Sequence, residues 1–167
     1  MEIKEKDLIR LSKTDISKQE INSVINVLKK GYLGMGDEVK FFESELSNYL
    51  GRDVACVVNG TAALQLALQA CNIGKGDEVL IPSLTYVASY QAILATGAMP
   101  VSCDVNEDDL IISISDARNK ITNNTKAIMP VFFSGGVGDL EALYSFAKEH
   151  KLRVIEDAAH AFGSRYN

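Results

Sequence analysis

The sequence predicts an α/β domain with a mostly parallel (mixed) sheet sandwiched by helices. Short apolar runs of strand length recur along the chain, and helical patterns of apolar residues alternate with them. This alternation is typical of parallel strands that are buried on both faces. The chain has 167 residues, 47% of them apolar, which is enough for one domain with a sizeable core.

Two helices are expected before the first strand. Ser17 and Glu20 have the spacing of a capping box, and apolar residues then recur at helical spacing until Gly31. A glycine-rich turn over residues 31–36 leads to a second amphipathic helix, which we expect to end at Gly51.

Five strands alternate with helices in the rest of the chain. The strands are expected at residues 54–58, 79–81, 99–103, 127–131 and 152–156. The helices are expected at residues 61–71, 86–96, 116–121 and 139–150. Because the chain stops soon after the last of these strands, one sheet edge would stay uncovered, and we expect the domain to continue beyond residue 167.

Composition and charge argue against several classes of partner. The formal net charge is −5 and the basic residues are scattered, whereas nucleic-acid binding favours clustered Lys and Arg. No apolar run approaches the roughly 20 residues of a membrane span, and the charged N-terminus does not resemble a signal peptide. Cys56, Cys71 and Cys103 form no CxxC pair, so we expect no metal site and reduced thiols in a cytoplasmic protein.

Ligands of parallel α/β sheets gather at the carboxyl ends of strands, and three such ends carry candidate site residues. The first is the Asn-Gly-Thr-Ala run at residues 59–62, between a strand and a helix. Gly60 allows close approach of a ligand, Thr61 offers a hydroxyl, and a helix N-terminus attracts phosphate. The same residues also fit a tight turn with an N-cap.

The other two candidates follow the second and the fifth strand. The Tyr86 ring is suited to stack on a planar heterocycle, or to pack with its hydroxyl in water. Asp157 follows a buried strand, where a carboxylate needs a hydrogen-bonding or cationic partner such as a protonated ring nitrogen. His160 lies three residues further on, and a helix N-cap Asp with a surface His also fits this segment.

A phosphate cradle, a stacking ring and an anion for a heterocyclic nitrogen are the parts needed to hold pyridoxal phosphate (PLP). The motifs that carry these residues also resemble a known family, the DegT/DnrJ/EryC1/StrS sugar aminotransferases among the fold type I PLP enzymes. The resemblance runs through most of the sequence, in four motifs: residues 34–43, 59–64, 76–88 and 156–161.

Carried over residue by residue, the resemblance implies a cofactor-binding set: Gly60, Thr61, Ala62, Tyr86, Asp157 and His160. The first three would contact the cofactor phosphate. Tyr86 would stack on the pyridine ring, Asp157 would pair with the ring nitrogen and keep it protonated, and His160 would lie against the cofactor.

Some features depart from the family's pattern. Phe132 stands where members often carry His, and the glycine-rich stretch 134–138 is less typical, which affects the active-site mouth and substrate choice. The Schiff-base lysine of the family lies downstream of the Asp157 motif, and no lysine follows Asp157 here. We therefore expect an N-terminal helical segment over residues 1–35 and the first part of a PLP-binding large domain over residues 36–167. The rest of that domain and a small C-terminal domain would be absent.

The activity implied by the resemblance is transfer of an amino group, usually from glutamate, to a nucleotide-linked keto-sugar by a homodimer. Without the lysine, this chain alone is expected to be inactive. Three alternatives stay open: a PLP-dependent sugar dehydratase with His at the lysine position, a non-catalytic relative that keeps the pocket, and a nucleotide-binding module. The last would hold its phosphate at Gly60 and Thr61, although no GxGxxG follows the first strand.

Overall fold

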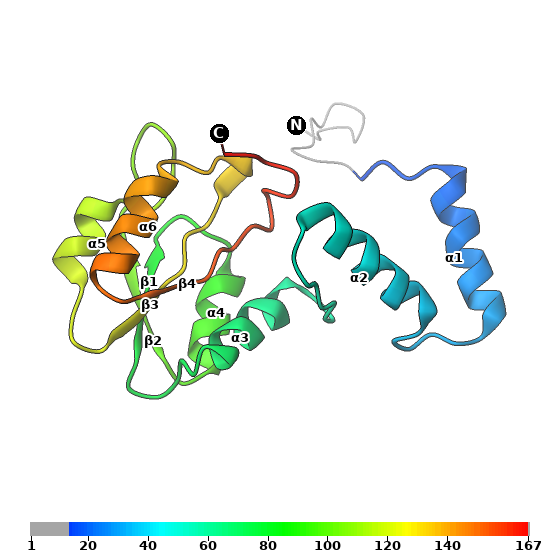
Figure 1. Cartoon of the computed structure of the whole chain (residues 1–167), viewed down its shortest axis with the longest axis horizontal. Helices are drawn as coiled ribbons and strands as arrows, with labels where there is room; N and C mark the ends of the chain where they lie inside the picture. The colour runs from blue at the N-terminus through cyan, green and yellow to red at the C-terminus, as the bar shows by residue number, and fades with distance from the viewer. Residues whose placement is uncertain (1–13, 167) are drawn as a thin grey trace, which may run out of the picture. The chain divides into compact units, whose positions relative to one another are not determined.

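The computed structural model describes residues 14–166, and their contacts divide into two compact units, with the division between Cys56 and Val57 (Figure 1). The first unit contains two helices, α1 (Lys18–Lys30) and α2 (Asp37–Leu50). The second unit contains the sheet and the remaining helices.

The helices of the first unit begin and end where the sequence predicts. The predicted capping box is present, since the Ser17 backbone N–H donates to Glu20 Oε2 at 2.6 Å and the Ser17 side chain accepts from Gln19 N. Gly31 and Gly51 end α1 and α2 in the left-handed conformation, with φ of 73° and 63°.

The second unit is built on a four-stranded sheet in which every ladder is parallel, with strand order β2-β1-β3-β4. The strands are β1 (Glu78–Pro82), β2 (Met99–Cys103), β3 (Thr125–Ile128) and β4 (Arg153–Val154). From β1 the chain first adds β2 on one side and then returns to add β3 on the other. The order reverses between β1 and β3, and in such sheets ligands bind beyond the carboxyl ends of the strands at this point.

Helices cover both faces of this sheet, as predicted (Figure 1). One face packs against α3 (Gly60–Ala70) and α4 (Val87–Ala95), and the other against α5 (Ile114–Lys120) and α6 (Leu140–Glu149). Among residues 14–166, no helix is both long and apolar enough to cross a bilayer.

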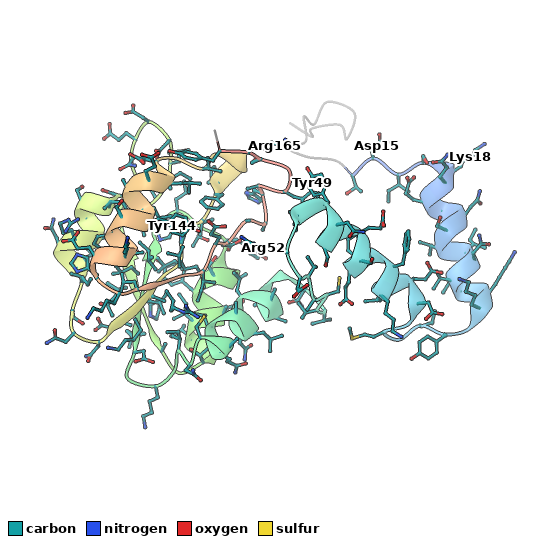
Figure 2. The ribbon with its side chains drawn as sticks, in the orientation of Figure 1. Asp15, Lys18, Tyr49, Arg52, Tyr144 and Arg165 are labelled. Atoms are coloured by element: carbon teal, nitrogen blue, oxygen red, sulfur yellow. The ribbon has the colours of Figure 1, made fainter. Side chains whose placement is uncertain are left out.

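The core follows the two-residue period of the strands. In β1, Val79 and Ile81 join the cluster that contains Leu68 of α3, whereas Leu80 joins the cluster that contains Phe146 of α6. All five side chains are at most 1% exposed. On the α6 side, Tyr144 (labelled in Figure 2) donates its hydroxyl to Glu156 Oε1 at 2.7 Å and so ties the helix to the segment after β4.

One predicted strand is wrong: residues 54–58 form no strand. The Val54 and Cys56 backbone N–H groups donate to side chains of α2, to Ser47 Oγ at 3.1 Å and to Glu43 Oε1 at 2.7 Å. A strand exists only beside a neighbour that completes its ladder, and these residues have no such neighbour within residues 14–166. The apolar pattern of the sequence does not show whether such a neighbouring strand is present.

The last two strands are shorter than the sequence predicts, but their backbones stay paired beyond the strand ends. Asp157 N donates to Pro130 O at 2.9 Å, and Phe132 N donates to Asp157 O at 3.1 Å. Asp157 is therefore held at the carboxyl edge of the sheet from both sides of its peptide unit.

Candidate functional site

A hollow of about 230 Å³ lies in the second unit, beyond the carboxyl ends of β1, β3 and β4. Five of the six predicted site residues line it: Gly60, Thr61, Tyr86, Asp157 and His160. They come from three separate segments, the start of α3, the connection between β1 and α4, and the chain after β4, so the fold brings together what the sequence spreads over 101 positions. We call this hollow the sheet-edge pocket.

The N-terminus of α3 forms one side of the sheet-edge pocket. Asn59 Oδ1 accepts from Ala62 N at 2.9 Å and caps the helix, and Ala62 does not line the pocket. The backbone N–H groups of Gly60 and Thr61 have no partner among the described residues. A Cβ atom built on Gly60 would meet no heavy atom within 4 Å. The N-cap and an open, positively polarised anion cradle are thus present in the same turn.

The Tyr86 ring is available to a ligand. Its side chain is 76% exposed, so Tyr86 does not pack into the core of the described structure. Its backbone is extended and immediately precedes α4. The alternative in which Tyr86 serves as a packing residue therefore does not apply to this structure.

Asp157 is the buried charge of the sheet-edge pocket, with 9% of the residue exposed. Its Oδ2 accepts from the Ser89 hydroxyl at 2.8 Å, and its Oδ1 accepts from Ala159 N at 3.3 Å. Because residues 158–166 form turns and no helix, Asp157 is not a helix N-cap. The carboxylate is thus paired, with its longer and weaker bond on Oδ1.

His160 and Phe133 form another wall of the pocket. The two rings meet edge to face, with centroids 5.9 Å apart and an interplanar angle of 61°. Phe132, which the sequence placed near the active-site mouth, is 4% exposed and belongs to the core. Its neighbour Phe133 lines the pocket instead, in the short 3₁₀ helix η2 (Phe133–Gly135).

Ser89 and Thr85 complete the site and were missed from the sequence. Thr85 lines the pocket, and Ser89 is fully buried on α4 beneath it. The available signal was weak: Ser89 is a small polar residue in an otherwise apolar helix, one turn after Tyr86.

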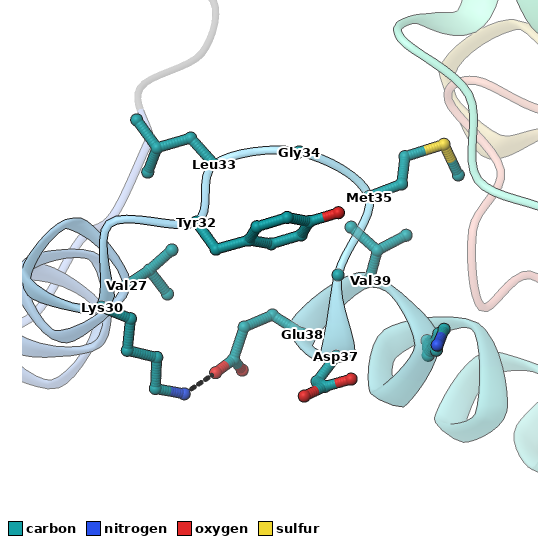
Figure 3. Close-up of a pocket in the computed structure, with 11 residues that line it drawn as sticks. Val27, Lys30, Tyr32, Leu33, Gly34, Met35, Asp37, Glu38 and Val39 are labelled. Atoms are coloured by element: carbon teal, nitrogen blue, oxygen red, sulfur yellow. Dashed lines mark hydrogen bonds and ion pairs between the residues drawn. The ribbon is translucent and has the colours of Figure 1, made fainter.

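A second hollow, of about 540 Å³, lies in the first unit at the turn between α1 and α2 (Figure 3). The Tyr32 ring lies along this turn, and a Cβ atom on Gly36 would come within 2.7 Å of it. Among the charged residues that line it, Lys30 Nζ and Glu38 Oε1 pair with each other at 2.5 Å. No predicted site residue lines this hollow.

Within residues 14–166, no three His, Cys, Asp or Glu side chains are arranged to hold a metal ion.

Comparison with solved structures gives close matches to aminotransferases. DesV from S. venezuelae is 37% identical with a TM-score of 0.75, and the match covers 86% of this chain and 39% of DesV. NtdA from Bacillus subtilis, solved with bound PMP, is 34% identical with a TM-score of 0.83, covering 89% of this chain and 35% of NtdA. Spr1654 from Streptococcus pneumoniae, given as a sugar aminotransferase and solved in its PLP form, is 33% identical with a TM-score of 0.86, covering 93% of this chain and 44% of Spr1654.

The chain thus spans 35 to 44% of the length of these three proteins. The sequence profile of one family matches residues 14–167, which is nearly the whole chain and includes every residue of the sheet-edge pocket. The chain therefore belongs to the DegT/DnrJ/EryC1/StrS aminotransferase family.

Proposed function

We propose that the sheet-edge pocket holds pyridoxal phosphate. The observation that carries this proposal is the buried Asp157 carboxylate, which lines the same pocket as the N-terminus of α3 and the exposed Tyr86 ring. A carboxylate oxygen accepts more than one hydrogen bond, so Oδ1 can accept from a protonated ring nitrogen besides its long bond from Ala159 N.

The phosphate end of the cofactor fits the turn before α3. The unpaired N–H groups of Gly60 and Thr61 would donate to phosphate oxygens, the Thr61 hydroxyl would add a further bond, and the helix dipole favours the negative charge. Ala62 belongs to the same turn, but its N–H already donates to Asn59 Oδ1. We therefore propose that Ala62 contributes less than Gly60 and Thr61 to binding of the phosphate. The empty space beside Gly60 leaves room for the group.

The remaining residues would orient the ring. Tyr86 would stack on one of its faces, and His160, supported by Phe133, would lie against the cofactor. Asp157 would keep the proton on the ring nitrogen, because a buried carboxylate stabilises a cation beside it. When bound, pyridoxal phosphate supplies an electron sink for the substrate bond that breaks.

The reaction we propose is transamination, in which an amino group passes from a donor, which we propose to be glutamate, to a nucleotide-linked keto-sugar. Family membership and the sugar aminotransferase among the solved relatives support the reaction type. The donor, the nucleotide and the polysaccharide pathways that such sugars feed are part of the proposal.

We propose that the 167-residue chain supplies the N-terminal portion of this activity and is inactive alone. No lysine lines the sheet-edge pocket among the described residues, so no amine within it can attach the cofactor covalently or carry the proton. In the family, that lysine lies downstream of the Asp157 motif.

The same proposal covers the organisation and setting of the protein. Residues 1–35 would form an N-terminal helical segment and residues 36–167 the first part of the PLP-binding large domain, in a homodimer. None of the residues of α1 and α2 is buried, although both helices are amphipathic. Their exposed apolar faces are consistent with packing against the rest of the large domain or against the second subunit of the homodimer. Cys56, Cys71 and Cys103 are all free, which suits a reducing, cytoplasmic setting.

The test is a version of the protein that continues through the family's lysine. We expect it to purify with the absorbance band of covalently attached PLP, and we expect borohydride to remove that band. A protein that stays colourless with added PLP, but gives a difference spectrum with NAD, would favour the nucleotide-binding alternative instead.

A further inference from the structure

A buried serine stands directly behind the Asp157 carboxylate. Ser89, on α4, is 0% exposed, and its Oγ lies 2.8 Å from Asp157 Oδ2. The same Oγ lies 2.7 Å from Thr85 Oγ1, which lines the sheet-edge pocket. Two segments 68 positions apart in the sequence are therefore joined by an unbroken row of three polar side chains.

Counting hydrogen atoms gives this row a direction. An ionised carboxylate can only accept, so the Ser89 hydroxyl donates to Asp157 Oδ2. Since a hydroxyl has one hydrogen, Ser89 must accept from Thr85, whose hydroxyl donates at 2.7 Å. The competing contacts, from either hydroxyl to Tyr86 O, are both longer, at 3.3 Å.

This row of hydrogen bonds determines which carboxylate oxygen of Asp157 is strongly hydrogen-bonded within the protein. Oδ2 accepts the short bond from Ser89, whereas Oδ1 has the 3.3 Å bond from Ala159 N. We infer that Ser89, supported by Thr85, is a positioning residue that holds the ionised Asp157 carboxylate so that Oδ1 is presented to the ring nitrogen of the cofactor. This inference rests on the proposed function, because it takes the ligand to contain a pyridine ring.

The test measures binding of pyridoxamine 5′-phosphate (PMP) to the 167-residue chain by isothermal titration calorimetry. PMP has the ring nitrogen and the phosphate but needs no lysine. Ser89→Ala should weaken PMP binding about tenfold, because a hydrogen bond to a charged group is lost. Ser89→Thr retains the hydroxyl and should restore most of the affinity.

A double-mutant cycle separates positioning from a general structural role. If Ser89 acts through Asp157, Ser89→Ala should have no effect in an Asp157→Ala background. The same tenfold loss in both backgrounds would overturn the inference. The matched control is Ser102→Ala, which removes a hydroxyl bonded to Tyr90 of the same helix at 2.9 Å outside the pocket; PMP affinity should not change.

Two further measurements decide the cases that the cycle leaves open. Where Asp157→Ala binds too weakly to titrate, the ring-¹⁵N resonance of labelled PMP should move toward the unprotonated position in Ser89→Ala, and an unchanged resonance would overturn the inference. Should the unmodified chain bind no PMP, the proposed function fails first. The crystal structure of unliganded Ser89→Ala then decides: a rotated Asp157 carboxylate supports the positioning role, and an unmoved one overturns it.

Discussion

At the scale of single residues, substitution of the buried Asp157 should have the largest effect on cofactor binding. Removing one partner of a buried ionic contact costs about 3–5 kcal/mol, since the other partner is left unpaired. In a version extended through the family's lysine, Asp157→Ala should therefore lower cofactor retention and turnover about 100-fold or more. Absorbance after dialysis and steady-state kinetics measure the two effects.

The matched control is Asp157→Asn, which keeps the shape of the side chain and removes its charge. It should lose nearly as much turnover as Asp157→Ala if the charge is what matters. Near-normal turnover in either variant would mean that Asp157 only stabilises the turn at residues 158–166.

Cys103 gives a prediction that is independent of the cofactor. Burial of the thiol, with a smaller contribution from Asp116, raises the pKa of Cys103 to about 11. At pH 8 only about one Cys103 in a thousand is then the reactive thiolate. Cys56 and Cys71 are partly exposed, so iodoacetamide should modify two cysteines quickly and Cys103 slowly, as followed by peptide mass spectrometry. Equal rates at all three in the folded protein would contradict this.

Site residues at strand ends could be predicted from the sequence, whereas those behind them could not. Tyr86 and Asp157 lie at the carboxyl ends of buried strands, where chemistry concentrates. Ser89 was missed because its importance comes from a contact with a residue 68 positions away. Phe133 was missed because two adjacent phenylalanines follow β3, and only the backbone geometry of η2 decides which one is buried.

At the scale of elements, a charged network joins α5 to the end of β2. Asp116 Oδ2 accepts from Asp104 N and pairs with Lys120 Nζ, both at 2.7 Å. The hydrogen bond from Lys120, then that from Asp104 N, holds the pKa of Asp116 below its ordinary value. Asp116→Asn should destabilise the fold by about 1 kcal/mol at pH 7, measured by urea unfolding.

The pH dependence of this difference has a definite sign. A carboxyl whose folded pKa lies below its unfolded value of about 3.9 stabilises the fold above that pH. The stabilisation is lost as the pH falls toward the folded pKa. The difference in unfolding free energy between wild type and Asp116→Asn should therefore be largest at pH 6–7 and should disappear below about pH 4. A gap that does not change with pH would exclude the charge as its cause.

Elements set by local chemistry were predicted well, and elements that need a distant neighbour were predicted less well. The capping box of Ser17 and Glu20 places the start of α1, and Gly51 places the end of α2. Residues 54–58 have the apolar composition of a strand but no ladder neighbour among the described residues, so their N–H groups bond to α2 side chains instead. β4 is short for a related reason, because beyond Val154 its pairing continues only as an isolated parallel bridge between Val131 and Asp157 and a hydrogen bond from Ile155 N to Ile128 O.

At the scale of the whole molecule, strand order and function are linked. The order β2-β1-β3-β4 reverses beside β1, and the pocket lies beyond the carboxyl ends of β1 and β3. The alternation of strands and helices in the sequence predicted a mostly parallel sheet with helices on both faces. It did not predict the strand order, because order depends on which faces the crossovers cover and not on local pattern.

The 167-residue chain should show no transaminase activity with glutamate and any keto-sugar. The reason is that no lysine lines the sheet-edge pocket among the described residues. An amino-transfer assay with added PLP, run beside the version extended through the family's lysine, checks this. Measurable turnover by the shorter chain would mean that the catalytic amine has been misplaced.

The most direct test of the central claim is a crystal structure of the 167-residue chain soaked with PMP. We predict that the phosphate accepts from the N–H groups of Gly60 and Thr61, that the ring lies on Tyr86, and that the ring nitrogen is within hydrogen-bond distance of Asp157 Oδ1. PMP bound elsewhere, or bound in this pocket with its ring nitrogen turned away from Asp157, would contradict the claim.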